Sequence, residues 1–233
     1  FESLESRLLL VTFVPTKDTT LYETTDGSLG NGSGVNLYAG TINRATNNLR
    51  RSLLQFDISF FPAGSTVTDA RLDMTVTRDP SGATPPHNFS LHKVNTNWGE
   101  GLSQAPGAGG RGTTAEANDA TWLHTFSNTA TWTNPGGDFV AAPSATTSVG
   151  NNGSPASWTS AQLVADVQSW INDPSGNFGW ILVGEESTLK SARRFASKEA
   201  PSGLGPVLDV TIAPPGPEVT ITTSTGSVPE LDG

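Results

Sequence analysis

The segment PAGSTVTDARLDMTV, residues 62–76, decides the fold class. A Pro-Ala-Gly turn leads into a run that carries apolar residues at Val67, Leu72, Met74 and Val76. Successive side chains of a strand point to opposite faces of a sheet, so an alternating pattern gives the strand one apolar face. We therefore expect a β-strand whose inward face, supplied by these four residues, packs on a core.

Runs of the same kind occur on both sides of this segment. Leu8–Val14 is apolar along most of its length and ends at Pro15, which predicts a buried strand. Thr, Ser, Asn and Gly are abundant and Lys is scarce, a composition typical of many short strands joined by tight turns. Further strands are expected at residues 18–23, 35–40, 50–58, 89–94, 179–184, 194–197 and 207–212.

One segment has helical rather than strand periodicity. Thr159–Ile171 places Leu163, Val164, Val167 and Trp170 on one apolar stripe, with Ile171 completing it. Thr159 and Gln162 have the spacing of a capping box, and Asp173-Pro174 ends the helix. The stripe predicts that this helix packs on a sheet.

These elements favour an all-β fold: a two-sheet antiparallel jelly-roll sandwich with one short amphipathic helix and long loops. We assign residues 10–213 to the sandwich domain. Residues 1–9 form an N-terminal extension that contains a candidate assembly strand. Residues 214–233 form a Pro-rich linker and a C-terminal extension strand at 218–223.

The Gly/Ala/Thr-rich stretch 95–155 is long for a connection inside a compact domain, unless its loops are packed or functional. It contains Trp98, Trp122 and Trp132. We expect it to fold over the sandwich and to bury some of these rings.

Ten motifs, in this order, resemble the DNRLRE-domain family, and together they span about residues 10–213. They are DTTLYE (18–23), NLRRSLLQFDIS (48–59), PAGSTVTDARLDMTV (62–76), NWGEG (97–101), DATWLHTF (119–126), NPGGDF (134–139), LVADVQSWI (163–171), NFGWILVG (177–184), RRFASKE (193–199) and PVLDVTI (206–212). The family consists of bacterial and archaeal extracellular jelly rolls related to a group of carbohydrate-binding modules. The resemblance implies that fold, and it supplies no shared catalytic residue to carry over.

Composition limits the partners. Acidic residues outnumber basic ones 22 to 13, which gives a net charge of −9, so nucleic acid and anionic lipid surfaces are excluded as partners. No stretch reaches the ~20 apolar residues of a membrane-spanning helix, so no membrane insertion is expected. We expect a secreted bacterial protein, extracellular or on the cell surface. It has no signal peptide, so Phe1 is expected to be a processed or trimmed start.

No catalytic constellation is recognisable, and the sequence predicts that the protein is not an enzyme. His87, His92 and His124 are the only histidines and are expected to be isolated surface or hydrogen-bonded residues. GNGSG at 30–34 matches neither the nucleophile-elbow nor the P-loop pattern and is expected to be a flexible turn between strands. We expect no cofactor, with a structural calcium ion as the one candidate.

Such sandwiches often tie a chain end down with oxygen ligands around calcium. The candidate ligands are Asp18, Glu23, Asp26, Asn31 and Asp209. No fixed ligand spacing links them, and ordinary turn and cap residues are the alternative interpretation.

Two functions from different classes remain. The first is a non-catalytic structural subunit that self-assembles head-to-tail with copies of itself into a filament or surface layer through an end segment. The second is a monomeric carbohydrate-binding module that stacks a polysaccharide on Trp98, Trp122 or Trp132, unless these rings are buried. An end strand in its own sheet would favour the module. The candidate assembly residues are Phe1, Leu4, Leu8, Leu10, Val219 and Ile221.

Overall fold

A computed structural model describes residues 8–80, 85–201 and 203–215. Most of the regular structure is β-strand, and the prediction of an all-β class with one short helix is confirmed. The strands are β1 Leu9–Phe13, β2 Lys17–Tyr22, β3 Leu29–Gly30, β4 Asn36–Thr41, β5 Leu49–Gln55, β6 Thr66–Arg78, β7 His87–Lys93, β8 Thr113–Thr114, β9 His124–Phe126, β10 Ala130–Thr131, β11 Ala145–Val149, β12 Pro155–Thr159, β13 Trp180–Val183, β14 Arg193–Ala196 and β15 Val207–Ala213.

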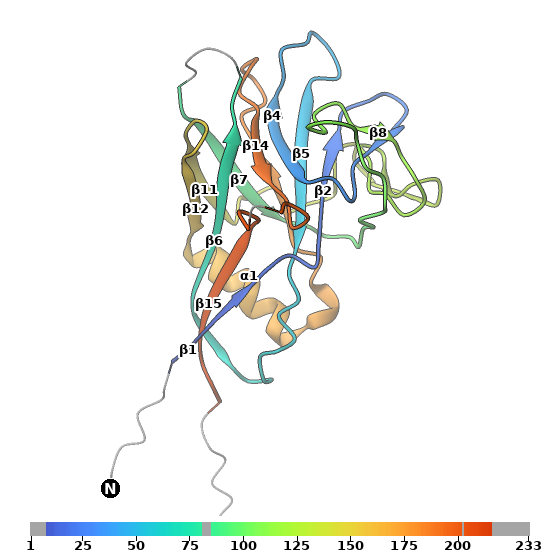
Figure 1. Cartoon of the computed structure of the whole chain (residues 1–233). Helices are drawn as coiled ribbons and strands as arrows, with labels where there is room; N and C mark the ends of the chain where they lie inside the picture. Colours follow the sequence, from blue (N-terminus) through green and yellow to red (C-terminus); the bar gives the residue numbers. More distant parts are fainter. Residues whose placement is uncertain (1–7, 81–84, 202, 216–233) are drawn as a thin grey trace, which may run out of the picture.

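The main sheet is antiparallel throughout and runs in the order β1-β15-β6-β14-β4-β5-β13-β7-β11. In addition, β12 pairs with β6 and β2 pairs with β5. The sheet curls, so that buried side chains from β6 and β15 share one core with those from β5, β7 and β13 (Figure 1). The jelly-roll topology and the division into domains stay predictions.

The segment that predicted the fold forms β6, the longest strand among the described residues. Val67 and Leu72 are an odd number of residues apart, so strict alternation would place their side chains on opposite faces of the sheet, yet both are buried. The reason is a register shift: Thr211 pairs with Asp69 and Ile212 pairs with Val67, so one extra β6 residue lies between them.

The helix α1 spans Ala161–Asn172 and is followed by the 3-10 turn η1, Pro174–Gly176. Its N-cap is Ser160, whose Oγ accepts a hydrogen bond from the Leu163 N–H at 2.9 Å, so the predicted cap at Thr159 is wrong by one residue. Thr159 is the last residue of β12. The predicted stripe is buried, except that Val164 is only half-buried.

The predicted burial of Leu8–Val14 is wrong. This segment contains β1, which pairs with β15 of its own chain from Leu9↔Ile212 to Phe13↔Leu208 and lies at the edge of the main sheet. Only Val11 and Phe13 pack on the core. A short apolar run has the same sequence pattern whether its strand lies at the edge or at the centre of a sheet. Its burial depends on the neighbouring strands that the fold places beside it.

The stretch 95–155 folds against the sheet as expected. It contributes β8, which pairs with β3, the strand pair β9–β10, β11 and the start of β12. It also supplies Trp98, Ala120, Trp122 and Trp132 to a second apolar cluster, which includes Leu53 of β5. Among the described residues, no helix is long and apolar enough to cross a membrane.

Candidate functional sites

The structure separates the five residues predicted to bind calcium. Glu23 Oε2 accepts the N–H groups of Asn48 and Leu49 at 2.7 and 2.9 Å, and Asp26 Oδ1 accepts the Ser28 N–H at 3.1 Å. These two carboxylates are turn and cap groups, as in the alternative interpretation.

Asn31 and Asp209 are likewise engaged in local contacts. Asn31 is buried, and its Oδ1 accepts the Ala105 N–H at 2.9 Å. Asp209 accepts hydrogen bonds from Arg71 Nη2 at 2.9 Å and from Thr12 Oγ1 at 2.6 Å. Of the five predicted ligands, only Asp18 lies in a cluster of acidic groups.

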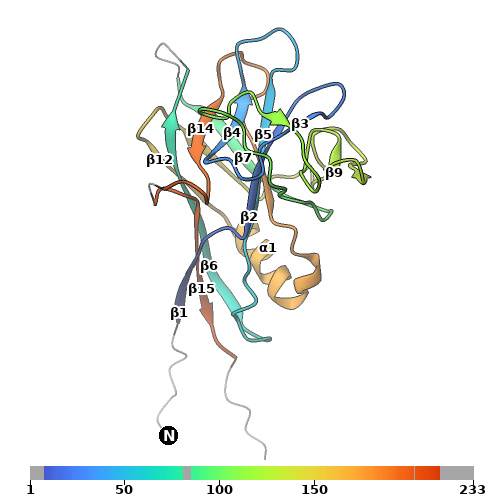
Figure 2. The same ribbon diagram turned by 45° about the vertical axis from the view of Figure 1, so that its right-hand side comes forward.

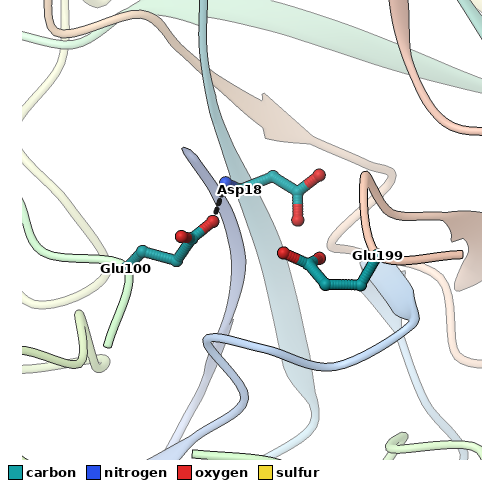
Figure 3. Close-up of side chains that lie close together, drawn as sticks. All are labelled: Asp18, Glu100 and Glu199. Carbon is teal, nitrogen blue, oxygen red and sulfur yellow. Dashed lines mark hydrogen bonds between the residues drawn. The ribbon is translucent and has the colours of Figure 1, made fainter. Parts of the chain in front are cut away.

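Asp18 lies near the start of β2 and meets two glutamates from distant parts of the chain. Glu100 follows β7 in the long stretch, and Glu199 follows β14. One carboxylate oxygen from each of the three residues lies within 4.8 Å of the others. Figure 3 shows the carboxylates of Asp18 and Glu199 pointing toward one another, with Glu100 beside the backbone of Asp18.

Hydrogen bonds hold this acidic cluster in place. The Asp18 N–H donates to Glu100 Oε1 at 2.7 Å, and Asp18 Oδ2 accepts the backbone N–H of Lys198 at 2.7 Å. The Lys198 ammonium forms ion pairs with Glu100, at 3.1 Å, and with Glu199. Two buried oxygens have no hydrogen-bond partner: Asp18 Oδ1 and Glu199 Oε2.

The electrostatics of the cluster follow from burial. Burial raises the pKa of Asp18 well above its ordinary value, and the charges of Glu199 and Glu100 raise it further. Burial also raises the pKa of Glu100. Burial alone would lower the pKa of Lys198, but its bonds to the two glutamates raise it. The cluster is therefore short of positive charge.

Sequence reasoning missed Glu100 and Glu199. Both stand in motifs quoted for the family resemblance, NWGEG and RRFASKE, and this was the available signal. It also missed Asp166, which is buried on α1 and accepts hydrogen bonds from Trp180 Nε1 at 2.9 Å and Ser144 Oγ at 2.5 Å.

The three tryptophans named for glycan stacking are buried. Trp98, Trp122 and Trp132 are 0%, 7% and 5% exposed. They belong to the second apolar cluster, with Leu21, Leu53 and Ile181 of the main sheet, which confirms the expectation of burial and removes them as a stacking platform. The guanidinium of Arg51 lies 5.0 Å from the Trp122 ring.

The three histidines and the glycine-rich segment 30–34 make contacts within the fold. His92 Nδ1 is hydrogen-bonded to Val140 O and His124 Nδ1 to Thr121 Oγ1, both at 2.9 Å, and His87 is half-buried at the start of β7. The expected turn between strands is present in residues 30–34, which connect β3 to β4. A Cβ on Gly32 would lie 1.9 Å from Glu100 O, so this segment is packed against the loop that follows β7.

A cleft of about 500 Å³ opens beside the end of β5 and α1. Polar side chains of Gln55, Asp57 and Asn177 line it together with apolar ones. Trp170 also lines it, and the Nε1 of this buried tryptophan has no hydrogen-bond partner.

The outer edge of β1 is the most apolar exposed feature near a chain end. Leu8, Leu10 and Val14 are 62%, 62% and 67% exposed, and within the described ranges 8–80, 85–201 and 203–215 β1 pairs only with β15. Leu8 and Leu10 are thus accessible, as the assembly prediction requires. Phe1, Leu4, Val219 and Ile221 lie outside the described residues.

Comparison with known proteins adds no assignment: the sequence matches no protein-family model and no curated protein. The resemblance to the DNRLRE-domain family stays a prediction.

Proposed function

We propose that the protein is a non-catalytic extracellular structural subunit that assembles head-to-tail with copies of itself. A terminal segment of one copy adds to the open outer edge of β1 in the next. The observation that carries the proposal is a strand edge that has no partner in the part of the chain that the structure describes, combined with the exposed side chains of Leu8, Leu10 and Val14. Soluble proteins normally blunt such edges with charge, proline or a covering loop.

The donor and the acceptor are different parts of the surface. Residues 9–13 belong to the subunit's own sheet, so they serve as the acceptor edge and not as the exchanged strand. The donor is then a segment outside the described residues: residues 1–7, with Phe1 and Leu4, or residues 218–223, with Val219 and Ile221. A donor patch that differs from its acceptor gives a heterologous contact, which forms a filament when it does not close.

The free energy of such a contact is sufficient for a stable association between subunits. Backbone hydrogen bonds to the open edge fix the register, and apolar side chains add affinity. Covering the three exposed side chains of the β1 edge contributes about 5 kcal/mol before ordering costs.

A charge placed on the edge tests the proposal. Leu10→Lys puts an ammonium beside the acceptor edge, and Leu10 is exposed, so the fold should be unaffected. We expect the unmodified protein to form large particles by light scattering and filaments by electron microscopy, and Leu10→Lys to reduce both. Leu102→Lys is the matched control, because Leu102 is 77% exposed and lies in the loop between β7 and β8, and this variant should assemble normally.

Two truncations identify the donor. Deleting residues 1–7, and separately everything after Pro217, should leave the described fold intact, and removal of the true donor should abolish assembly. If the full-length protein and both truncations are all monomeric at high concentration, the assembly proposal is wrong.

The second candidate is a monomeric carbohydrate-binding module. The placement of β1 in its own sheet favours it, and the cleft lined by Gln55, Asp57 and Asn177 offers hydrogen-bonding groups with an unpartnered Trp170 Nε1. Titration calorimetry with soluble polysaccharides, comparing the wild-type protein with Asp57→Ala, tests it. Saccharide binding that Asp57→Ala removes, by a protein that stays monomeric, would favour the module.

A further inference from the structure

We propose that Asp18, Glu100 and Glu199 form a calcium-binding site that ties three distant segments of the chain together. This site is independent of the proposed assembly. It joins β2 to the loop after β7 and to the loop after β14 (Figures 2 and 3).

The spacing of the ligands fits one ion. Calcium–oxygen distances in proteins are about 2.3–2.6 Å, so two oxygens on opposite sides of one ion lie about 4.8 Å apart or slightly more. The three carboxylate oxygens lie within 4.8 Å of one another. Calcium accepts 6–8 oxygens in flexible geometry, and carboxylates, backbone carbonyls and water all serve as ligands.

The second observation is an unsatisfied acceptor aimed into the cluster. Asp18 is 1% exposed, its Oδ2 is used by the Lys198 N–H, and its Oδ1 has no partner. Glu199 Oε2 is buried and unpartnered as well. An unpaired buried acceptor destabilises the fold, and more so when it is charged, so a ligand is expected beside these two oxygens.

The charge balance identifies the ligand as a divalent cation. Lys198 is paired with Glu100 and Glu199, while the Lys17 ammonium donates to Trp98 O at 2.7 Å. With the three carboxylates ionised and the Lys198 ammonium present, two negative charges are left over. The Lys198 ammonium bonds to the Oε1 atoms of the glutamates and leaves Asp18 Oδ1 and Glu199 Oε2 to the ion. Oxygen-only ligands suit a hard cation, and the irregular arrangement suits calcium better than magnesium, which requires near-octahedral geometry.

Calcium titration of the full chain tests the site. After treatment with a chelator, the thermal midpoint should rise by about 5–10 °C at a calcium concentration roughly a hundred times Kd. Terbium should give luminescence sensitised by Trp98, two residues from Glu100, and calcium should compete with it. Magnesium should produce a smaller shift than calcium.

Variants assign the response to the cluster. Asp18→Asn should abolish both the calcium shift and the terbium signal. Glu199→Gln serves the same purpose if Asp18→Asn fails to fold, as judged by circular dichroism. Asp26→Asn is the matched control and should keep both signals, because Asp26 is an exposed cap of Ser28.

The alternative is that a proton shared by Asp18 and Glu199 replaces the metal. In that case the midpoint would rise on acidification without metal, and calcium would change nothing. A wild-type protein without a calcium shift or terbium signal overturns the proposal, and so does an Asp18→Asn protein that retains them.

Discussion

Asp18 is both a residue of a core strand and a buried ionisable group. Its backbone belongs to β2, its carboxylate is almost fully buried, and its pKa is raised by burial and by two neighbouring glutamates. In the unfolded chain the same group has an ordinary pKa of about 3.9. The difference links the stability of the metal-free protein to pH.

The sign of this linkage follows from proton binding. The folded state holds the Asp18 proton at pH values where the unfolded state has released it. The contribution of Asp18 to the free energy of unfolding is therefore fully present below about pH 4 and is lost as the pH rises through the raised folded pKa. Replacing Asp18 with Asn removes the titration, so the fall in stability above about pH 4 should become shallower.

Denaturant unfolding of chelator-treated protein across this range measures the effect. Asp26→Asn is the control with the opposite sign. Hydrogen bonds from Ser28 lower the pKa of Asp26, so its contribution is present above the unfolded pKa and is lost on acidification. Identical pH profiles for wild-type and Asp18→Asn proteins would contradict the buried-charge interpretation.

At the scale of elements, α1 is anchored by its tryptophan. Trp170 is 1% exposed, and its ring centroid lies 4.5 Å from that of Trp180 in β13. Trp170→Ala should lower the free energy of unfolding by about 3–5 kcal/mol, because it removes a large side chain from a packed core. Phe60→Ala is the control: Phe60 is 67% exposed, and its loss should cost less than about 1 kcal/mol. Thermal and denaturant unfolding measure both, and an unchanged midpoint for Trp170→Ala would show that α1 contributes little to the core.

Element types could be predicted from the sequence better than element environments. The alternation in β6 and the 3.6-residue period of α1 are local signals, and both elements are found where they were expected. The burial of β1 was mispredicted, because its position at the sheet edge depends on the pairing with β15, about 200 residues away in sequence. The helix cap was missed by one residue, since Thr159 and Ser160 are both good caps and only the end of β12 distinguishes them.

At the scale of the whole molecule, candidate sites could be predicted only where their residues are local. Asp18 was selected for its residue type, but its partners lie 82 and 181 positions further along the chain, and no spacing rule connects them. The burial of the three loop tryptophans, in contrast, was expected from the length and composition of the stretch that carries them.

The whole molecule is also predicted to lack hydrolase and lyase activity on polysaccharides. No recognisable nucleophile, acid–base pair or metalloenzyme motif is present in the sequence. Reducing-end and unsaturated-sugar assays with a panel of polysaccharides should show no turnover above a heat-treated control. Turnover that disappears when one carboxylate or histidine is replaced would contradict this prediction.

The antiparallel pairing of β1 with β15 has a mechanical consequence. Leu9 at the start of β1 faces Ile212 near the end of β15, so the chain enters and leaves the described fold at the same end (Figure 1). Tension applied through both ends would peel the two strands apart one hydrogen bond at a time, each bond contributing only about 1 kcal/mol. A load applied between one chain end and a strand paired along the outer edge of β1 would instead shear several backbone hydrogen bonds at once. A fibre built on the β1 edge would therefore resist stretching in a way that a tether through the two termini does not.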